Sequence, residues 1–255
     1  MQKYLDKKVI VISGGTKGVG KSIAIECAKQ GANVVFSGRD QIEADVVLKD
    51  IINSGMTGKF VNTDLHDIKQ CKRLFDVAIH SFGRVDGFVN YAGVTPVASL
   101  TDCEEYIFDD VFNINIKAAF FCTKQAVLSM QKNGGGTIVL FGSPHSWSGE
   151  KDRAAYAVSK GALYTLSEHI AHNYACDKIR CNYVTMGWTP TDGELELRKS
   201  QGISKNKLLE IAAHEVPMGR MCSVEDHIPG VIYLLSDYSS MVTGSNLRIT
   251  GGLYI

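Results

Sequence analysis

The sequence predicts an α/β protein built on a seven-stranded parallel sheet with helices on both faces. Short β-rich runs alternate with amphipathic helical stretches along the 255 residues, and no two of these runs are joined by a two-residue hairpin turn. Strands without hairpin connections pair in parallel through helical crossovers, which bury both faces of a sheet. The chain has no internal repeat, low-complexity tract or linker, so residues 1–255 should form a single domain.

Apolar periodicity gives the first elements in order. Residues 9–13 are a continuous apolar run, typical of a buried strand, and residues 19–30 carry an apolar stripe at helical spacing. A second strand at 34–37 is followed by Asp40-Gln41-Ile42-Glu43, which we interpret as a capping box that opens a helix over 40–54.

The same alternation continues to the end of the chain. A glycine turn at 134–136 separates a long helix from the fifth strand. The remaining predicted elements are a strand at 59–62, a helix at 68–82, a strand at 87–90, a long helix at 104–131, a strand at 137–141, a helix at 153–175, a strand at 179–185, a helix at 224–235 and a strand at 246–249.

Composition argues against several classes of function. Lysine plus arginine balances aspartate plus glutamate at 27 each, so no overall field attracts nucleic acid or an anionic membrane. The first apolar run begins at Val9 and is too short for a signal peptide or a membrane span, which predicts a cytoplasmic protein. The seven cysteines form no C-x-x-C pair, so we expect reduced thiols and no metal site.

Glycines cluster where the first strand meets the first helix, and they admit two interpretations. Gly14, Gly18 and Gly20 form G-x-x-x-G-x-G, where backbone N–H groups and a helix N-terminus can approach a pyrophosphate. The overlapping segment from Gly15 to Ser22 also satisfies the P-loop pattern of nucleotide hydrolases. That class needs an aspartate at the end of an apolar strand to hold magnesium, whereas the fourth strand ends in Asn90. The hydrolase remains the weaker alternative.

Tyr156 and Lys160 are the candidate acid–base pair. Four residues apart on a helix, they lie on one face, where the ammonium favours the phenolate. A free tyrosine has a pKa near 10, so a base that works near neutral pH needs a depression of about 2 to 3 units. The same spacing recurs at residues 4 and 8 and at residues 174 and 178, so spacing alone does not identify the pair.

Surrounding landmarks separate the middle pair from the other two, and with them the chain resembles the short-chain dehydrogenase/reductase family over nearly its whole length. Ser143 stands thirteen residues before Tyr156, as the family pattern requires. The landmarks are Gly14, Gly18 and Gly20; Asn90-Tyr91-Ala92-Gly93; Asn115; Ser143; Tyr156 and Lys160; Ile179-Arg180-Cys181-Asn182; Leu235-Ser236-Asp237; Thr243-Gly244; and Gly251-Gly252. The family's fold is a Rossmann-like doubly wound sheet, in agreement with the periodicity.

The resemblance implies an NAD(P)-dependent oxidoreductase with four catalytic residues. Tyr156 would exchange a proton with a carbonyl or alcohol oxygen while a nicotinamide exchanges hydride with the carbon. Ser143 would hydrogen-bond that oxygen and position it. Lys160 would lower the tyrosine pKa and bind the nicotinamide ribose, and Asn115 would hold a water on a proton route to solvent.

The end of the second strand, Ser37-Gly38-Arg39, favours NADP(H) over NAD(H). An NAD enzyme usually carries an acid there for the ribose 2′-hydroxyl, whereas a 2′-phosphate needs a cation. Gly38 occupies the acid's position, Arg39 follows, and Lys17 faces the same region; Asp40 is better explained as an N-cap. By resemblance, the cofactor-binding residues are Gly14, Lys17, Gly18, Gly20, Arg39, Asp64, Asn90, Ala92, Gly93, Tyr156, Lys160, Gly187, Thr189 and Thr191.

Substrate specificity should lie in a polar segment at about 189–216, which we interpret as a mobile lid with two short helices. Ser143, His145 and Trp188 are the candidate substrate contacts. Three positions depart from the family pattern, namely Tyr91, Ala118 and Met186, where the family usually has Asn, Gly and Pro.

The prediction is therefore an NADP(H)-dependent enzyme that acts on a ketone or a secondary alcohol. The alternative from another class is a cofactor-binding regulatory module without turnover. A sugar, an acyl thioester, a steroid and a small ketone all remain open as the small-molecule substrate. Family resemblance implies a homotetramer built through the helices at 104–131 and 153–175, with no nucleic-acid or membrane partner.

Overall fold

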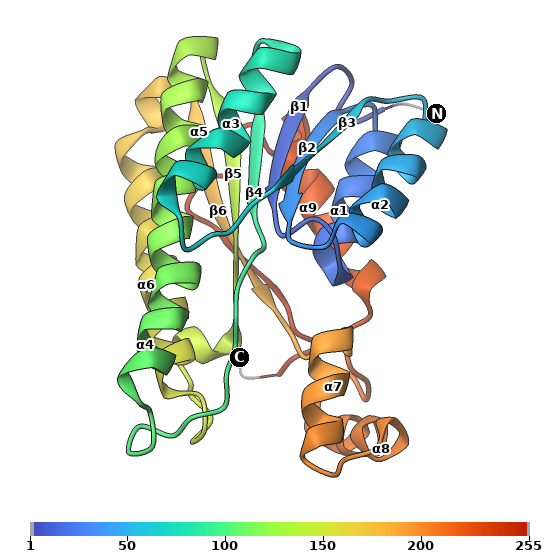
Figure 1. Ribbon diagram of the computed structural model, residues 1–255, viewed down its shortest axis with the longest axis vertical. Coiled ribbons are helices and arrows are strands. Elements are labelled where there is room, and N and C mark those ends of the chain that lie inside the picture. The colour runs from blue at the N-terminus through green and yellow to red at the C-terminus, as the bar shows by residue number, and fades with distance from the viewer. Residues whose placement is uncertain (1–2, 254–255) are drawn as a thin grey trace.

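A computed structural model describes residues 3–253 and confirms the predicted fold class. Seven parallel strands form one sheet in the order β3-β2-β1-β4-β5-β6-β7, with helices on both faces (Figure 1). The chain builds outward from β1 to β3, returns to β4 beside β1, and builds outward again to β7. This is the order of a doubly wound sheet.

The predicted strands all form, within one or two residues of their expected ends. They are β1 (Val9–Ser13), β2 (Asn33–Gly38), β3 (Gly58–Asn62), β4 (Gly87–Asn90), β5 (Gly136–Gly142), β6 (Ile179–Met186) and β7 (Asn246–Ile249). The α-helices are α1 (Gly18–Lys29), α2 (Gln41–Asn53), α3 (Ile68–Phe82), α4 (Glu105–Phe112), α5 (Ala119–Asn133), α6 (Ala154–Asn173), α7 (Asp192–Ser200), α8 (Lys205–Glu215) and α9 (Val224–Leu235).

The sheet separates two hydrophobic cores, one on each face. Along β1, Val9 and Val11 pack with side chains of α3, α5 and α6, whereas Ile10 and Ile12 pack with α1, α2 and α9. Figure 1 shows the same two layers, with α1, α2 and α9 to the right of the sheet and α3, α5 and α6 to the left. Successive side chains of a strand point to opposite faces, so the continuous apolar run at 9–13 reflects burial on both.

The long helix predicted at 104–131 forms as a continuous run of helical backbone over residues 105–133, but part of it is π-helical. α4 ends at Phe112, and a π-helical turn at Asn113–Ala118 separates it from α5. Within this turn, the side chain of Asn115 accepts from the Val94 amide at 2.8 Å and donates to the Val94 carbonyl at 2.9 Å and to Ser159 at 3.1 Å. A π turn re-aims a side chain within a helix, and here the tertiary partners of Asn115 account for it.

The predicted N-cap at Asp40 is confirmed, but the second half of the capping box is not. Asp40 Oδ1 accepts from the Glu43 amide at 3.2 Å. The Glu43 carboxylate turns instead to Lys21 of α1, with 3.3 Å between Oε2 and Nζ. The ion pair ties α2 to α1, which the local motif could not indicate.

β1 and β4 lie side by side although the chain winds away from them in opposite directions, so their carboxyl ends open a crevice. Ser13 and Asn90, the last residues of the two strands, are in register, and Ser13 Oγ donates to Asn90 Oδ1 at 3.0 Å. α7 and α8 lie beyond the carboxyl ends, apart from the helices that cover the sheet (Figure 1).

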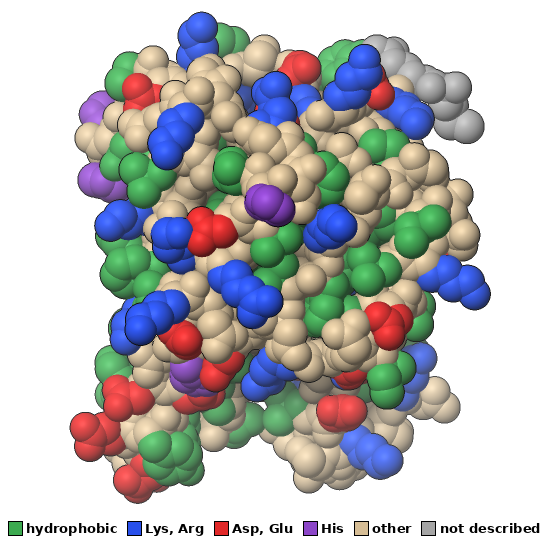
Figure 2. Space-filling model, turned by 45° about the horizontal axis from the view of Figure 1, so that its top comes forward, with side chains coloured by type: hydrophobic (Ala, Val, Ile, Leu, Met, Phe, Trp, Pro, Cys, Tyr) green, Lys and Arg blue, Asp and Glu red, His purple; other side chains and the backbone are tan. Residues whose placement is uncertain are grey.

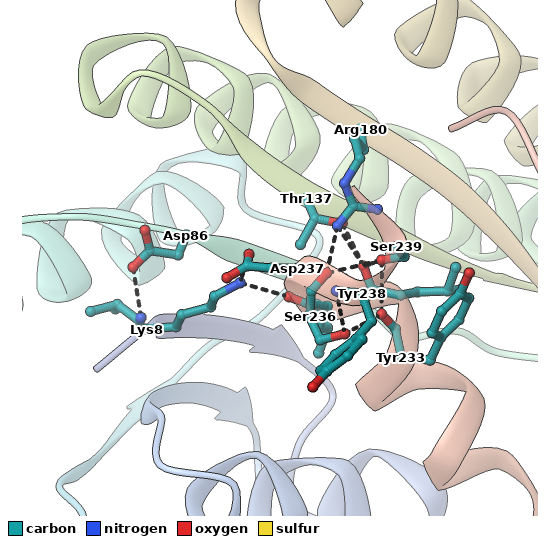
Figure 3. Close-up of polar contacts among 12 residues, drawn as sticks. Lys8, Asp86, Thr137, Arg180, Tyr233, Ser236, Asp237, Tyr238 and Ser239 are labelled. Atoms are coloured by element: carbon teal, nitrogen blue, oxygen red, sulfur yellow. Dashed lines mark hydrogen bonds and ion pairs between the residues drawn. The ribbon is translucent and has the colours of Figure 1, made fainter. Parts of the chain in front are cut away.

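At the amino-terminal end of the sheet, Arg180 of β6 holds the end of α9 (Figure 3). Its guanidinium donates to the carbonyls of Leu234, Ser236 and Val242 at 2.9, 3.2 and 3.0 Å. Thr137 of β5 also donates to the Leu234 carbonyl, at 3.0 Å. The last carbonyls of a helix have no partner within the helix, so these bonds fasten α9 to two strands.

The surface around this end carries both signs of charge. Figure 2 turns the upper end of Figure 1 toward the viewer, and basic and acidic side chains are scattered over it. Within residues 3–253, no helix has the length and the apolar composition that crossing a bilayer requires.

Replacement of Arg180 by Met should lower the free energy of unfolding by about 2 to 4 kcal/mol, because partly buried carbonyls lose a charged donor. Lys8 supplies the comparison in the same network: its ammonium pairs with the exposed Asp237 at 2.6 Å and makes one longer bond to the Leu235 carbonyl at 3.3 Å, so Lys8→Met should cost less, about 1 kcal/mol. Urea unfolding measures both variants. Equal losses would mean that Arg180 contributes no more than a surface ion pair.

Candidate active site

A cleft of about 870 Å³ opens at the carboxyl ends of the strands, between the glycine turn and the segment that carries α7 and α8. It gathers fifteen of the predicted site residues from seven separate segments of the chain. They are Gly14, Lys17, Gly18, Arg39, Asp64, Ala92, Gly93, Ser143, His145, Tyr156, Lys160, Gly187, Trp188, Thr189 and Thr191.

The glycines allow the backbone around the turn to pack closely. Gly14 has φ +79°, and a Cβ on it would lie 2.9 Å from the Ala92 backbone. A Cβ on Gly20 would lie 2.1 Å from the Gly14 carbonyl, so Gly20 serves close packing behind the turn and does not line the cleft. The result is a turn without side chains at Gly14 and Gly18, which fits a diphosphate at the N-terminus of α1, although the hydroxyl of Tyr91 already engages the Val19 amide of the first helical turn.

Two predicted site residues have side chains that lie outside the cleft lining. Asn90 is buried and accepts from Ser13, which joins β4 to β1. Asn115 is buried too, and its amide is engaged by the Val94 backbone and by Ser159. Its side chain therefore fixes one wall of the cleft, and the expected role of Asn115 in holding a water stays a prediction.

Ser143, Tyr156 and Lys160 meet at the centre of the cleft. Ser143 follows β5, and Tyr156 and Lys160 lie one turn apart on α6. Lys160 is 5% exposed; its Nζ donates to the Phe141 carbonyl at 2.9 Å and lies 5.6 Å from the centroid of the Tyr156 ring. The other two Tyr-x-x-x-Lys copies lie away from the cleft lining, and one of them has Lys8 paired with Asp237.

The pKa of Tyr156 is raised above its ordinary value, contrary to the expectation that Lys160 lowers it. Burial is the largest cause, and it outweighs the lowering by a hydrogen bond with Ser143 and by the charge of Arg153; the charge of Glu194 raises it further. Burial also lowers the pKa of Lys160 to about 8. The Lys160 amine donates to the Phe141 carbonyl, and loss of hydration is the largest influence on the pKa of both Tyr156 and Lys160.

Arg153 is a site residue that the sequence did not identify. It is 4% exposed, and its Nη1 donates to the Thr95 carbonyl at 2.9 Å and to Thr95 Oγ1 at 3.1 Å. These bonds hold the segment after β4 against the start of α6. Its position one turn before Tyr156 is a signal that could have drawn attention to it.

The segment after β6 brings further side chains into the cleft. Thr189 is buried; its hydroxyl donates to the Gly187 carbonyl at 3.0 Å and lies 2.9 Å from Nε2 of the buried His227. Thr191 is the N-cap of α7, and its methyl group would lie 3.5 Å from a Cβ on Gly18. The start of α7 therefore touches the glycine turn.

His145 and Trp188, the other two candidate substrate residues, line the same cleft as Ser143. The ring of His145 stands edge-on to that of Tyr156, with 5.9 Å between centroids, and its Nδ1 lies 3.1 Å from the Ser148 carbonyl. Trp188 Nε1 donates to Glu194 at 2.7 Å. Glu194 and its partner Arg198 are further lining residues that sequence reasoning missed.

The end of β2 carries no acid in the position that would meet a ribose 2′-hydroxyl. A Cβ on Gly38 would lie 2.5 Å from the Thr16 side chain, so no side chain fits there without displacing Thr16. Arg39 is exposed and lines the cleft. Lys17 Nζ pairs with Asp40 at 2.9 Å, and this exposed pair can open at little cost.

Asp64 lies in a small charged group at the end of β3. His66 Nδ1 lies 2.8 Å from Asp64, and its Nε2 lies 2.8 Å from Asp110. Hydrogen bonds from the backbone and the ring of His66 lower the pKa of Asp64, and the two carboxylates raise the pKa of His66. Asp64 is thus held as an anion at the cleft edge.

The P-loop interpretation of Gly15 to Ser22 is wrong. Lys21 pairs with Glu43 and does not line the cleft. Ser22 lines a separate groove between α1, α2 and α9. The two residues that would bind phosphate and magnesium therefore point away from the exposed backbone of the turn.

Many known proteins match this chain, and the following four matches extend over nearly its whole length. A family described as enoyl-(acyl carrier protein) reductase matches residues 14–254. The L-rhamnose 1-dehydrogenase (NAD(P)(+)) of Azotobacter vinelandii is 31% identical over 258 residues, which cover 97% of each chain. A short-chain type dehydrogenase/reductase from Mycobacterium marinum superposes with a TM-score of 0.86 at 26% identity, over 98% of this chain and 96% of that chain. A Beutenbergia cavernae protein solved with NADP bound at low occupancy gives a TM-score of 0.90 at 28% identity, over 99% and 98%.

The buried amine of Lys160 should make stability depend on pH. Its pKa of about 8 in the folded protein lies below the ordinary 10.5, so protonation opposes folding; the penalty is complete below pH 8 and is lost as the pH rises through 10.5. From about pH 7 to about pH 10, the wild type should gain about 2 to 3 kcal/mol in unfolding free energy relative to Lys160→Met. Urea unfolding of both proteins measures this difference, from which other titrations cancel. A constant difference would contradict the lowered pKa.

Proposed function

The chain belongs to the short-chain dehydrogenase/reductase family, and from this premise we propose that it is an NADP(H)-dependent oxidoreductase that interconverts a ketone and a secondary alcohol. The single observation that carries the proposal is the meeting of Ser143, Tyr156 and Lys160 in one cleft with the glycine turn. The bound nicotinamide supplies or accepts the hydride. The residues of the chain handle the oxygen and the proton.

Tyr156 is the general acid in the direction of reduction. Its raised pKa keeps the phenol protonated at neutral pH, so it can give its proton to the carbonyl oxygen as that oxygen gains charge. Ser143, 6% exposed, donates a hydrogen bond to the same oxygen and fixes its position. In the direction of oxidation, the same proton returns from the alcohol to Tyr156.

Lys160 supplies positive charge where the phenolate forms. With Nζ held near Gly93, whose Cβ would lie 3.6 Å away, the amine is also within reach of ribose hydroxyls along that wall. Binding of the dinucleotide would give the ammonium new hydrogen bonds and so oppose the desolvation that lowers its pKa. A protonated Lys160 would then lower the pKa of Tyr156 in the complex, and Asn115 would hold the wall through Val94.

Two further proposals concern the surroundings of the cleft. Residues 189–216 act as a lid over the substrate end, since α7 and α8 stand apart from the sheet (Figure 1). The protein works as a cytoplasmic homotetramer through α4, α5 and α6, whose outer faces leave large apolar side chains exposed, among them Tyr106, Phe120 and Val158.

Replacement of Tyr156 by Phe should lower kcat for carbonyl reduction at least about 1000-fold, because the proton donor is lost. NADPH affinity should change less than about threefold. Tyr174→Phe is the matched control, because this tyrosine also precedes a lysine by four residues and lies outside the cleft lining. Turnover is followed by NADPH absorbance and binding by NADPH fluorescence. Binding without turnover of any carbonyl compound by the wild type would favour the regulatory module instead.

Replacement of Arg39 by Asp should raise the dissociation constant for NADPH about 10- to 100-fold, since the 2′-phosphate loses a cation and meets an anion. Affinity for NADH should stay the same or improve, because the carboxylate can accept from the 2′-hydroxyl. Arg73→Asp on the exposed face of α3 makes the same change in net charge away from the cleft. Equal losses for both cofactors would contradict the proposed preference for NADP(H).

A further inference from the structure

Trp188, Glu194 and Arg198 form a charged cluster at the lid end of the cleft that the proposed chemistry does not use. Trp188 Nε1 and Arg198 Nε both donate to Glu194 Oε1 at 2.7 Å. The guanidinium also lies over the indole ring, 5.3 Å from its centroid. The side chains of Glu194 and Arg198 are only 16% and 18% exposed. Removing two charges from water costs free energy even when they pair with each other, so the presence of this pair in the cleft requires an explanation.

The cluster leaves an acceptor and a donor for a ligand. Among the residues that the structure describes, both hydrogen bonds to the Glu194 carboxylate go to Oε1. The Arg198 guanidinium uses Nε for this bond and Nη1 for Gln201, at 3.3 Å. Oε2 of Glu194 can therefore accept, and Nη2 of Arg198 can donate. Hydroxyl groups on neighbouring carbons match this pair, because every hydroxyl both donates and accepts.

A second group of charged side chains that line the cleft, Arg153 and Glu150, also forms an ion pair. Arg153 binds Thr95 through Nη1, and its Nε lies 3.8 Å from Glu150 and 3.7 Å from Asp152. Arg153 and Glu194 line the same cleft as Tyr156, and their charges act on its pKa in opposite directions: that of Arg153 lowers it and that of Glu194 raises it. Neither group presents an unpaired cation, so this end offers little attraction to an anionic substrate.

Size limits the substrate as well. The cleft of about 870 Å³ must hold both the dinucleotide and the substrate. Its apolar members at the lid end, which include Leu197, Ile211 and Leu253, can contact the C–H groups of a small molecule. A large apolar substrate would cover Glu194 and Arg198 without giving them hydrogen bonds, at a cost of about 1 to 3 kcal/mol for each group left unsatisfied.

We propose that the substrate is a small, neutral polyhydroxy compound, a sugar or a polyol, and that Glu194 and Arg198 bind a hydroxyl group beside the reacting carbon. This inference rests on the proposed function and specifies its substrate class. Oxidation of the reacting C–OH would send its hydride to the oxidised cofactor and its proton to Tyr156, which leaves a ketone or a lactone. The neighbouring hydroxyl stays intact and serves recognition only.

The first test compares substrate classes with NADP⁺ as cofactor. Neutral aldoses, pentitols and hexitols form the main panel, cyclohexanol is the apolar comparator, and aldonates are the anionic comparator. At least one neutral polyhydroxy compound should exceed both comparators in kcat/KM by about 100-fold or more, because a site built around hydroxyl groups discriminates strongly against molecules that lack them. Its analogue without the hydroxyl next to the reacting carbon should lose a similar factor.

The second test replaces Glu194 by Gln. KM for the preferred sugar or polyol should rise about tenfold or more, because the charged acceptor is lost, and this rise should exceed the fall in kcat for the same substrate. Glu210→Gln is the control, since Glu210 forms an exposed ion pair with Lys207 in the same lid. Unchanged NADPH affinity and an unchanged melting temperature verify that Glu194→Gln is folded.

The outcomes separate this inference from the proposed function. Tyr156-dependent turnover of cyclohexanol or aldonates alone overturns the substrate class and leaves the oxidoreductase intact. Turnover of polyols with the same KM in wild type and Glu194→Gln overturns the role of Glu194. Absence of turnover with every class in this panel overturns the substrate class, whereas the proposed function fails only if the wild type also reduces no carbonyl compound with NADPH.

Discussion

Burial of the Lys160 amine is the constraint around which the cleft is arranged. The amine is almost removed from water and has the Phe141 carbonyl of β5 as its protein partner. The nearby wall is fixed by Asn115, whose place in a π turn lets it grip Val94 from both sides. Three elements thus converge on one nitrogen. A charge with little access to water interacts strongly with its neighbours. The Lys160 ammonium can therefore stabilise a Tyr156 phenolate and hold a ribose that binds beside it.

Apolar periodicity was sufficient to predict the strands and most helices, because burial determines which of their residues are apolar and on which face each element packs. β1 is apolar throughout because two cores meet on it, and the sheet order follows from strands that have no hairpins. The π turn after α4 could not be predicted in this way. It depends on contacts of Asn115 with residues more than twenty positions away in the chain, which leave no mark on the local pattern. The same holds for Glu43, which turns from its own helix to Lys21.

The residues of the cleft were predictable as a group because the chain returns repeatedly to the carboxyl edge of the parallel sheet, in the segments after β1, β2, β3, β4, β5 and β6 and on the adjoining α6. Asn90 and Asn115 were exceptions, because their side chains make hydrogen bonds in the protein interior, to Ser13 and Ser159, and do not line the cleft. Arg153 and the Glu194–Arg198 pair were not predicted as site residues, because the sequence does not distinguish them from ordinary surface charges. Charged pairs at helical spacing are common on surfaces, and only the folded chain brings these charges into the cleft that Tyr156 lines.

Thr191 has a consequence that extends across the cleft. It begins α7 and at the same time adjoins Gly18, so one residue belongs to both the dinucleotide end and the substrate end. A dinucleotide bound at the glycine turn would therefore also meet the first turn of α7. If it ordered Thr191, a substrate that needs the same arrangement would bind more tightly, and by reciprocity the substrate would strengthen dinucleotide binding by the same factor. One residue would in this way couple the two ligands without direct contact between them.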